Sequence, residues 1–216
     1  MKDNISGIGI FGGSFDPIHL GHLRLVETIQ NVVQLNEIKM LFSPRPSHKA
    51  CSLISESHRW RMLCLACQGK EGLIPEPLEK KRPGVSFAIH TLEYFSEILD
   101  NVNLCWIIGS DAFSGLNSWY RWEELFQFCN FIVVERPGYK EILNGGLLQV
   151  CRKKFVDEID NRQNGQIYRV AAPMLNVSST QIRARLKAGL AVDSLLPVAV
   201  TDYINQHQLY SHGIRR

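Results

Sequence analysis

Residues 10–22 read IFGGSFDPIHLGH, an apolar run followed by glycines, a proline and two histidines three positions apart. The apolar residues 8–11 predict a strand, and the apolar spacing over residues 20–34 predicts a helix soon afterwards. The segment between them is therefore a strand-to-helix turn. Its glycines, Gly12 and Gly13, allow a ligand to approach the backbone closely, and N–H groups at such a turn and at a helix start attract phosphate.

The two histidines of this stretch, His19 and His22, would share one face at the start of the helix. An imidazole there can donate a hydrogen bond to an oxygen on which negative charge develops. The alternative is that both side chains only cap or pack the helix. The stretch lacks the G-x-G-x-x-G pattern of dinucleotide-binding folds and the chain has no P-loop sequence, so a dehydrogenase or a P-loop kinase is disfavoured.

The rest of the chain alternates between short apolar runs and helical patterns. Continuously apolar runs are typical of strands covered on both faces, and the alternation favours parallel strands joined by helices. We therefore predict an α/β fold, a Rossmann-like parallel sheet with helices on both faces, in a single domain over residues 1–216 with a C-terminal helical segment over residues 183–216. The expected strands cover residues 8–11, 38–42, 73–74, 102–108, 131–134 and 167–171; the expected helices cover residues 20–34, 55–68 and 86–99, the last with Phe87, Thr91, Tyr94 and Phe95 facing inward; residues 79–86 are expected to form a loop.

Polar clusters follow five of the predicted strands, in each case where the strand ends. Ligands of open parallel sheets bind beyond the carboxyl ends of the strands. Because all five clusters would lie on that one edge, together they predict a site there. The clusters are GGSFDPIH at 12–19, SPRPSHK at 43–49, GSD at 109–111, ERPGY at 135–139 and NVSST at 176–180.

Composition narrows the class of protein. The 216 residues are 45% hydrophobic and 21% charged, which is ordinary for a globular protein with a sizeable core. A net charge of +3 fits an anionic small molecule better than a nucleic acid, which needs a concentrated basic stripe. No run approaches the roughly 20 apolar residues of a membrane span, and the first residues do not resemble a signal peptide. We therefore expect a cytoplasmic protein without a nucleic-acid or membrane partner.

The six cysteines are accordingly expected to be reduced. Cys64 and Cys67 form a C-x-x-C pair, but they lie within a helical pattern and the chain has no second such pair. They are expected to be buried structural thiols rather than a metal or redox site.

The last of these clusters continues as NVSSTQIRARL at residues 176–186, and it supports the phosphate site predicted at the turn of residues 12–19. Ser178, Ser179 and Thr180 fall at a predicted helix start, where hydroxyls are favoured as caps, and Arg183 can reach back over that helix end. Hydroxyls, amides and a guanidinium together make a phosphate clamp. The alternative is an ordinary N-cap followed by a solvated basic face.

With these motifs the chain resembles the nucleotidyltransferases of the HxGH type. Within that superfamily it resembles the bacterial nicotinate-nucleotide adenylyltransferases, and this resemblance extends over nearly the whole chain. The supporting stretches, besides GGSFDPIHLGH, are SHK at 47–49, RPGVSFA at 82–88, IIGSDAF at 107–113, Trp119-Tyr120, ERPGY at 135–139, VSSTQIR at 177–183 and LLPVAVTDYINQHQLY at 195–210. The resemblance implies an enzyme that joins nicotinate mononucleotide to the AMP part of ATP, giving deamido-NAD and pyrophosphate. It also implies Mg²⁺ bound with ATP and no protein metal ligands, in keeping with the lack of an acidic cluster.

The resemblance further implies a role for individual residues. Catalysis would fall to His19, His22 and Arg183. ATP would be bound by Gly12, Gly13, Ser14, Phe15, His19, His22, Gly109, Asp111, Val177, Ser178, Ser179, Thr180 and Arg183. Nicotinate mononucleotide would be bound by His48, Lys49, Ser86, Phe87, Trp119, Tyr120 and Arg136, with Trp119 stacked on the pyridine ring.

Several of these residues also have purely structural interpretations. Asp111 could be a helix N-cap and Trp119 a core residue. His48 and Lys49 could belong to a basic loop, and Arg136 could form a surface salt bridge.

The chain departs from the family pattern at two places. It has Pro46-Ser47-His48 where the family often has Pro-Pro-His, and Ser86-Phe87-Ala88 where the family often has Ser-Tyr-Thr. Carboxylate recognition survives the second change if backbone N–H groups hold the pyridine carboxylate. It does not survive if the hydroxyls are needed.

Three other functions stay open. The same reaction could use nicotinamide mononucleotide or phosphopantetheine as acceptor, although Trp119-Tyr120 and ERPGY are not typical of the phosphopantetheine enzymes. The chain could be a non-catalytic nucleotide-binding module, against which intact His19, His22 and Arg183 argue. It could be an RNA-binding fragment of synthetase type, against which the lack of a basic stripe argues. The sequence does not predict an oligomeric state.

Overall fold

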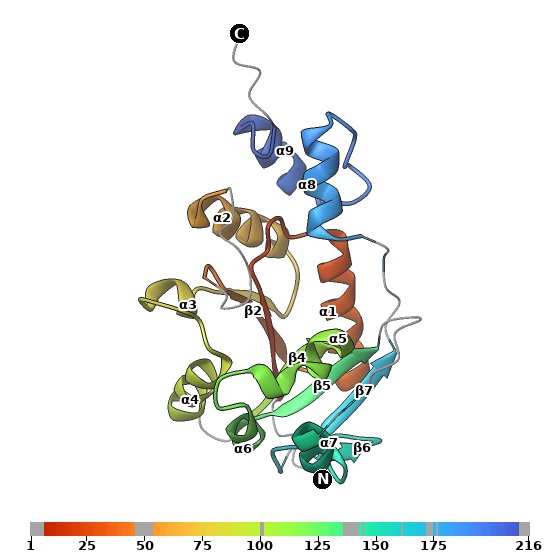
Figure 1. Cartoon of the computed structure of the whole chain (residues 1–216). Helices are drawn as coiled ribbons and strands as arrows, with labels where there is room; N and C mark the ends of the chain where they lie inside the picture. Colours follow the sequence, from red (N-terminus) through yellow and green to blue (C-terminus); the bar gives the residue numbers. More distant parts are fainter. Residues whose placement is uncertain are drawn as a thin grey trace.

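A parallel β-sheet forms the centre of the protein (Figure 1). The computed structural model describes residues 7–45, 54–99, 102–135, 143, 145–160, 162–171, 175 and 177–211. In these residues seven strands pair in the order β3-β2-β1-β4-β5-β7-β6, and every neighbouring pair is parallel. The strands are β1 (Gly7–Gly13), β2 (Glu37–Phe42), β3 (Leu73–Glu76), β4 (Asn103–Gly109), β5 (Asn130–Glu135), β6 (Phe155–Val156) and β7 (Ile167–Ala171).

The central strands are covered on both faces, as their unbroken apolar sequences predict. In β4, Leu104 and Trp106 enter one core layer, whereas Cys105 and Ile107 enter the other. One layer is built with α1 (Leu20–Val33), α2 (Glu56–Cys67), α8 (Ser179–Lys187) and α9 (Val198–Gln206). The other is built with α3 (Leu78–Lys81), α4 (Ala88–Ile98), α5 (Ser110–Ser114), α6 (Leu125–Phe128), α7 (Gly145–Cys151) and a 3-10 turn at Leu116–Ser118. The predicted fold class is confirmed.

The structure differs from the sequence-based expectation at three places. The expected loop over residues 79–86 begins inside α3, and the C-terminal helices begin at Ser179, ahead of residue 183. Tyr94 does not face inward: it is 36% exposed and lies against the guanidinium of Arg82, 5.4 Å from ring centre to Cζ. The short helices α3, α5, α6 and α7 have between 4 and 7 residues, too few to show a helical period in the sequence.

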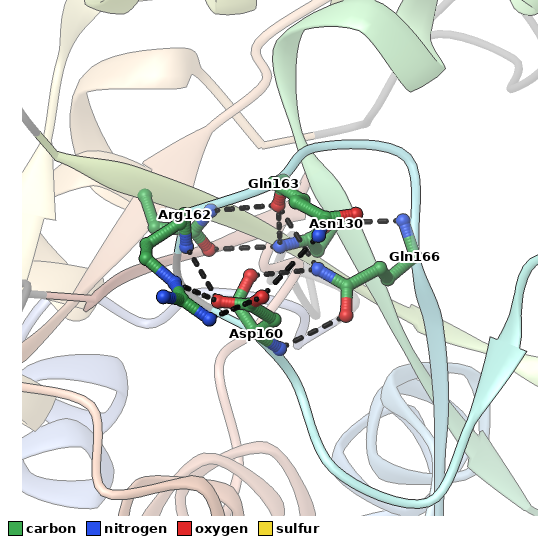
Figure 2. Close-up of polar contacts among 6 residues, drawn as sticks. Asn130, Asp160, Arg162, Gln163 and Gln166 are labelled. Atoms are coloured by element: carbon green, nitrogen blue, oxygen red, sulfur yellow. Dashed lines mark hydrogen bonds and ion pairs between the residues drawn. The ribbon is translucent and has the colours of Figure 1, made fainter.

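A network of polar side chains joins the start of β5 to the loop before β7, at the amino ends of these strands (Figure 2). Asn130, the first residue of β5, donates to the carbonyl of Gln163 at 3.0 Å and accepts from the Gln166 amide at 2.8 Å. The side chain of Gln166 bonds the backbone of Asp160 in both directions, at 2.9 and 2.7 Å. Figure 2 shows these side chains turned toward one another. The amino ends of β5 and β7 are therefore held together by the protein's own hydrogen bonds.

The opposite edge, at the carboxyl ends of the strands, has a topological switch point. From β1 the chain proceeds outward through β2 and β3, then returns to place β4 on the other side of β1. Ligands of such sheets bind in the crevice where the strand order reverses. The turn after β1 and the Gly109 turn after β4 both lie there. No helix in the described part of the chain is long and apolar enough to span a membrane.

Candidate active site

His19 and His22 cap each other at the start of α1. His19 is the N-cap residue, and its Nδ1 accepts from the backbone N–H of His22 at 3.3 Å. In return, Nδ1 of His22 accepts from the backbone N–H of His19 at 3.2 Å. The two rings stack with centroids 3.6 Å apart. The two side chains thus do cap the helix, and this capping puts the imidazoles side by side, as their spacing predicts. Capping does not decide whether they also bind a ligand.

This reciprocal capping also fixes where the imidazole protons lie. In a neutral imidazole one ring nitrogen accepts and the other donates. Because both Nδ1 atoms accept from backbone N–H groups, the proton of each neutral ring belongs on Nε2. The two Nε2–H groups are therefore donors that the helix does not use for capping.

The backbone at this helix start is less available to a ligand than expected. The N–H of Leu20 donates to the carbonyl of Leu195 at 3.0 Å, and that of His22 is bonded to His19. These two N–H groups cannot also bind a phosphate.

Burial keeps His19 neutral. Its side chain lies among protein atoms with 6% of the residue exposed, and desolvation lowers its pKa from 6.5 to about 4. A buried imidazolium would lose its hydration, which disfavours the charged form. At neutral pH, His19 is therefore an uncharged donor.

The shifted pKa of His19 predicts acid destabilisation of the fold. Between pH 6.5 and about 4 the unfolded chain binds a proton that the folded chain does not, so the free energy of unfolding falls as the pH is lowered through this range. At pH 5 the loss is about 2 kcal/mol. We expect urea unfolding at pH 7.5 and pH 5 to show it as a difference between wild type and His19→Asn, in which other titrating groups cancel. Equal losses in the two proteins would contradict it.

Gly21, between the two histidines, has a steric role. A Cβ at this position would lie 2.8 Å from Cγ1 of Val177 and 2.9 Å from Nδ1 of His19. Any side chain would thus push against the capping nitrogen or against the segment before α8. The absence of a Cβ at Gly21 lets both the His19 ring and that segment approach α1.

The turn before α1 is held in an unusual conformation. Phe15 has a φ of 43° and is 2% exposed, and its ring lies edge-on to His22 with centroids 5.4 Å apart. A Cβ on Gly13 would lie 2.9 Å from the Phe15 ring. Strained residues of this kind persist where the surrounding structure fixes them, and they gather at binding sites.

The last of the predicted polar clusters lies against this turn. Ser178 is the N-cap of α8, in a capping box with Gln181. The hydroxyl of Ser179 donates to the carbonyl of Pro17 at 3.0 Å. Arg183 reaches back as predicted: it donates to the carbonyl of Asp16 at 2.8 Å and to Oγ1 of Thr180 at 3.3 Å. The α8 start and the α1 turn are therefore one unit, and part of the predicted clamp is used to join them.

Two residues that sequence reasoning missed hold the same turn. Arg59 of α2 is 5% exposed and donates to the carbonyls of Ser14 at 3.0 Å and Pro44 at 3.1 Å, so it joins the turns after β1 and β2. The hydroxyl of Tyr210 donates to Oδ1 of Asp16 at 2.7 Å. The sequence held a signal for Arg59. It lies three residues before Met62 and four before Leu63, so in the predicted helix it falls on the same apolar face. Tyr210 carried no comparable signal.

Four of the residues predicted to bind nicotinate mononucleotide lie in the part of the chain that the structure describes, and they lie near one another. The ring centroids of Phe87 and Tyr120 are 4.9 Å apart, and Tyr120 is 52% exposed. Trp119 packs edge-on against Trp106 of β4 with centroids 6.1 Å apart, so its core interpretation is partly right. The Ser86 amide donates to the carbonyl of Arg45 at 3.3 Å, which joins this segment to the turn after β2. The aromatic surface thus adjoins the crevice.

The GSD turn lies at the end of β4. Gly109 is the N-cap of α5, and Asp111 is the second residue of that helix and exposed, so its N-cap interpretation is wrong. The predicted positions His48, Lys49 and Arg136 lie outside the described residues. Cys64 and Cys67 are free thiols, and Cys67 is buried, which raises its pKa to about 12. The expected burial is therefore confirmed for Cys67, whereas Cys64 is only partly buried.

The chain is similar to known proteins over nearly its whole length. The model of the cytidylyltransferase-like family matches residues 10–185. A protein of Pseudomonas aeruginosa named probable nicotinate-nucleotide adenylyltransferase is 38% identical over 206 residues, 94% of this chain and 96% of its own length. A protein of the same name from Shewanella frigidimarina is 31% identical over 94% of this chain and 99% of its own length. The chain belongs to the nicotinate-nucleotide adenylyltransferase family.

Solved structures show the same fold. A Plasmodium falciparum nicotinic acid mononucleotide adenylyltransferase complexed with NaAD matches with a TM-score of 0.72 at 22% identity, over 95% of this chain and 97% of that one. The family membership predicted from GGSFDPIHLGH and the later motifs is confirmed. As a member of the adenylyltransferase family, the chain is a nucleotidyltransferase, and the crevice between β1 and β4 is its candidate active site.

Proposed function

We propose that this protein transfers AMP from ATP to nicotinate mononucleotide, giving deamido-NAD and pyrophosphate in a step of NAD biosynthesis. The observation that carries the proposal is the stacked, mutually capped pair of imidazoles, His19 and His22, at the start of α1 directly after β1. It occurs in a chain that matches, over nearly the whole length of both proteins, relatives named for this activity. We further propose that residues 1–216 act as a single domain in the cytoplasm.

The reaction needs no nucleophile from the protein. An oxygen of the mononucleotide's 5′-phosphate attacks the α-phosphorus of ATP and forms a P–O bond. The bond from that phosphorus to the bridging oxygen breaks, and pyrophosphate leaves with the electron pair. Since both reactants are anionic, the barrier is charge repulsion and alignment, so catalysis consists of positioning and electrostatics.

The residues of the crevice suit that task. Neutral His19 and its neighbour His22 donate hydrogen bonds to phosphate oxygens as charge builds on the leaving group. Arg183 adds a fixed positive charge and a planar fork of donors. The Ser179–Pro17 hydrogen bond brings the start of α8 against the turn before α1, so the positive dipole ends of both helices lie near that turn. Gly12, Gly13, Ser14 and Phe15 supply the turn against which ATP would lie, and Val177, Ser178 and Thr180 supply the facing helix start.

Mg²⁺ enters this scheme as part of the substrate. Within the described ranges no three His, Cys, Asp or Glu side chains gather to hold a metal ion. The donors of the crevice are N–H groups, hydroxyls and a guanidinium, which bind phosphate oxygens rather than a cation. We infer that Mg²⁺ binds through the ATP phosphates and water, which is its preferred mode.

The choice of acceptor is the test of the proposal. The aromatic pair Phe87 and Tyr120, with Trp119 nearby, offers flat surfaces for a pyridine ring. Pyrophosphate release would be followed with MgATP and, in parallel, nicotinate mononucleotide, nicotinamide mononucleotide or phosphopantetheine. We expect the nicotinate acceptor to exceed the amide by at least about tenfold in kcat/KM, the effect of one charged hydrogen bond.

The other outcomes have definite meanings. Equal rates with the amide would show that Ser86-Phe87-Ala88 does not select the carboxylate and would leave the reaction intact. Release only with phosphopantetheine would overturn the proposed acceptor. Release with none of the three would leave a nucleotide-binding module.

A further inference from the structure

The carboxylate of Asp16 is contacted from the far end of the chain. Its Oδ1 accepts the hydroxyl hydrogen of Tyr210, 194 residues away, with the two oxygens 2.7 Å apart. Asp16 lies in the turn between β1 and α1, directly before Pro17. Its side chain is 14% exposed, so the hydrogen bond is largely shielded from water.

Tyr210 is directed to this point by the turn after α9. Gln208 and Tyr210 both have left-handed backbones, with φ of 51° and 64°. Between them Leu209 is buried, and its N–H donates to the carbonyl of Ile204 at 3.0 Å. The buried Leu209 anchors the turn, and Tyr210 beside it is partly buried. Burial, and next the charge of Asp16, raise the pKa of Tyr210, so its hydroxyl remains a donor.

The same carboxylate faces Arg183. Its Oδ2 is 3.9 Å from Nη1 of Arg183, whereas the backbone carbonyl of Asp16 accepts from that nitrogen at 2.8 Å. A close carboxylate–guanidinium pair has N···O distances of about 2.7–2.9 Å and is often two-pronged. Here Oδ1 of Asp16 is bonded to Tyr210 and Oδ2 is 3.9 Å from Arg183, so the carboxylate and the guanidinium do not form a close two-pronged pair. The Arg183 side chain is 37% exposed, and its positive charge is only partly balanced by Asp16.

We propose that Tyr210 is a positioning residue for ATP binding: its hydroxyl holds the Asp16 carboxylate off Arg183, so that the guanidinium is free to bind the triphosphate. Without the hydroxyl, the carboxylate can turn and pair with Arg183 through both oxygens. It then competes with ATP for the same cation. This inference rests on the proposed function only in taking ATP as the ligand of this crevice.

The test compares the binding of an ATP analogue to single and double variants. Calorimetry with α,β-methylene-ATP and Mg²⁺ measures affinity without turnover and without any acceptor. We expect Tyr210→Phe to weaken binding about fivefold, the upper range for a partly exposed ion pair. Adding Asp16→Asn to this variant should restore the affinity to within about twofold of wild type, since an amide carries no charge to compete.

Tyr203→Phe is the matched control. Tyr203 lies in α9, and its hydroxyl is 2.9 Å from Nδ1 of His58 in α2, so it also loses one side-chain hydrogen bond. We expect it to bind the analogue like wild type, with a thermal stability close to that of Tyr210→Phe. KM for the acceptor should be unchanged in both variants.

Each outcome is decisive. If Tyr210→Phe binds the analogue like wild type, or if Asp16→Asn does not restore its binding, the inference is wrong while the proposed reaction stands. If affinity falls equally in the two tyrosine variants, Tyr210 has a structural role only. Wild-type protein that does not bind the analogue at all would overturn the proposed function, and the inference with it.

Discussion

Replacement of His19 by asparagine lowers kcat by about 10² or more while leaving α1 capped. Asparagine is a strong N-cap residue, and its side-chain oxygen can accept from the His22 N–H as Nδ1 of His19 does. It cannot replace the Nε2–H donor on the far side of the ring. The variant therefore keeps the cap while it removes the donor proposed to stabilise the leaving pyrophosphate, together with the ring stacked on His22. The loss of one such donor has this size. Pyrophosphate release under saturating substrates measures it.

Two further variants separate catalysis from stability. His19→Ala loses both the donor and the cap, so we expect the same loss of kcat and, in addition, a destabilisation of about 1 kcal/mol. The capping box makes this cost foreseeable, although the sequence alone suggests that His19→Ala barely affects folding. His207→Asn, at an exposed position of the chain just after α9, is the control and should keep wild-type turnover. A kcat for His19→Asn within about threefold of wild type would rule out the proposed role.

The features of the fold that could be predicted are those that local patterns determine. The unbroken apolar runs in β4 and β5 are buried on both faces, and the polar residues that follow each strand lie at one edge because the sheet is parallel. The spacing of His19 and His22 is a local property too, so their pairing follows from it. The strand at residues 167–171 was predicted with its observed bounds.

The features that could not be predicted depend on contacts between distant residues. Nothing near Tyr210 indicates that its hydroxyl reaches Asp16, since the hydrogen bond closes a loop of nearly the whole chain. The occupied N–H groups of α1 are another example: Leu20 is bonded to Leu195, from a segment that only the fold brings close. Sequence patterns identify which residue types gather at an edge, whereas the fold decides which of their donors are already used.

Replacement of Arg183 by alanine lowers kcat/KM for ATP by about 10² or more. The guanidinium combines a fixed charge with a fork of donors, one of which already bonds the Asp16 carbonyl. Its loss removes charge-assisted bonds to the triphosphate and the link between α8 and the α1 turn. Arg183→Lys keeps the charge, but a single ammonium cannot hold Asp16 and Thr180 in the same planar geometry. We expect lysine to recover no more than about a tenth of the activity.

Arg185 of the same helix provides the matched control. It is exposed, and its Nε donates to the carbonyl of Ala191 at 3.0 Å, within its own end of the chain. Arg185→Lys makes the same chemical change two residues away and should leave kcat/KM for ATP within about twofold of wild type. Steady-state rates with ATP varied at saturating nicotinate mononucleotide measure all three variants. If Arg183→Lys behaves like Arg185→Lys, then charge alone suffices at residue 183, and the planar fork linking the α1 turn, α8 and the triphosphate has no part in binding.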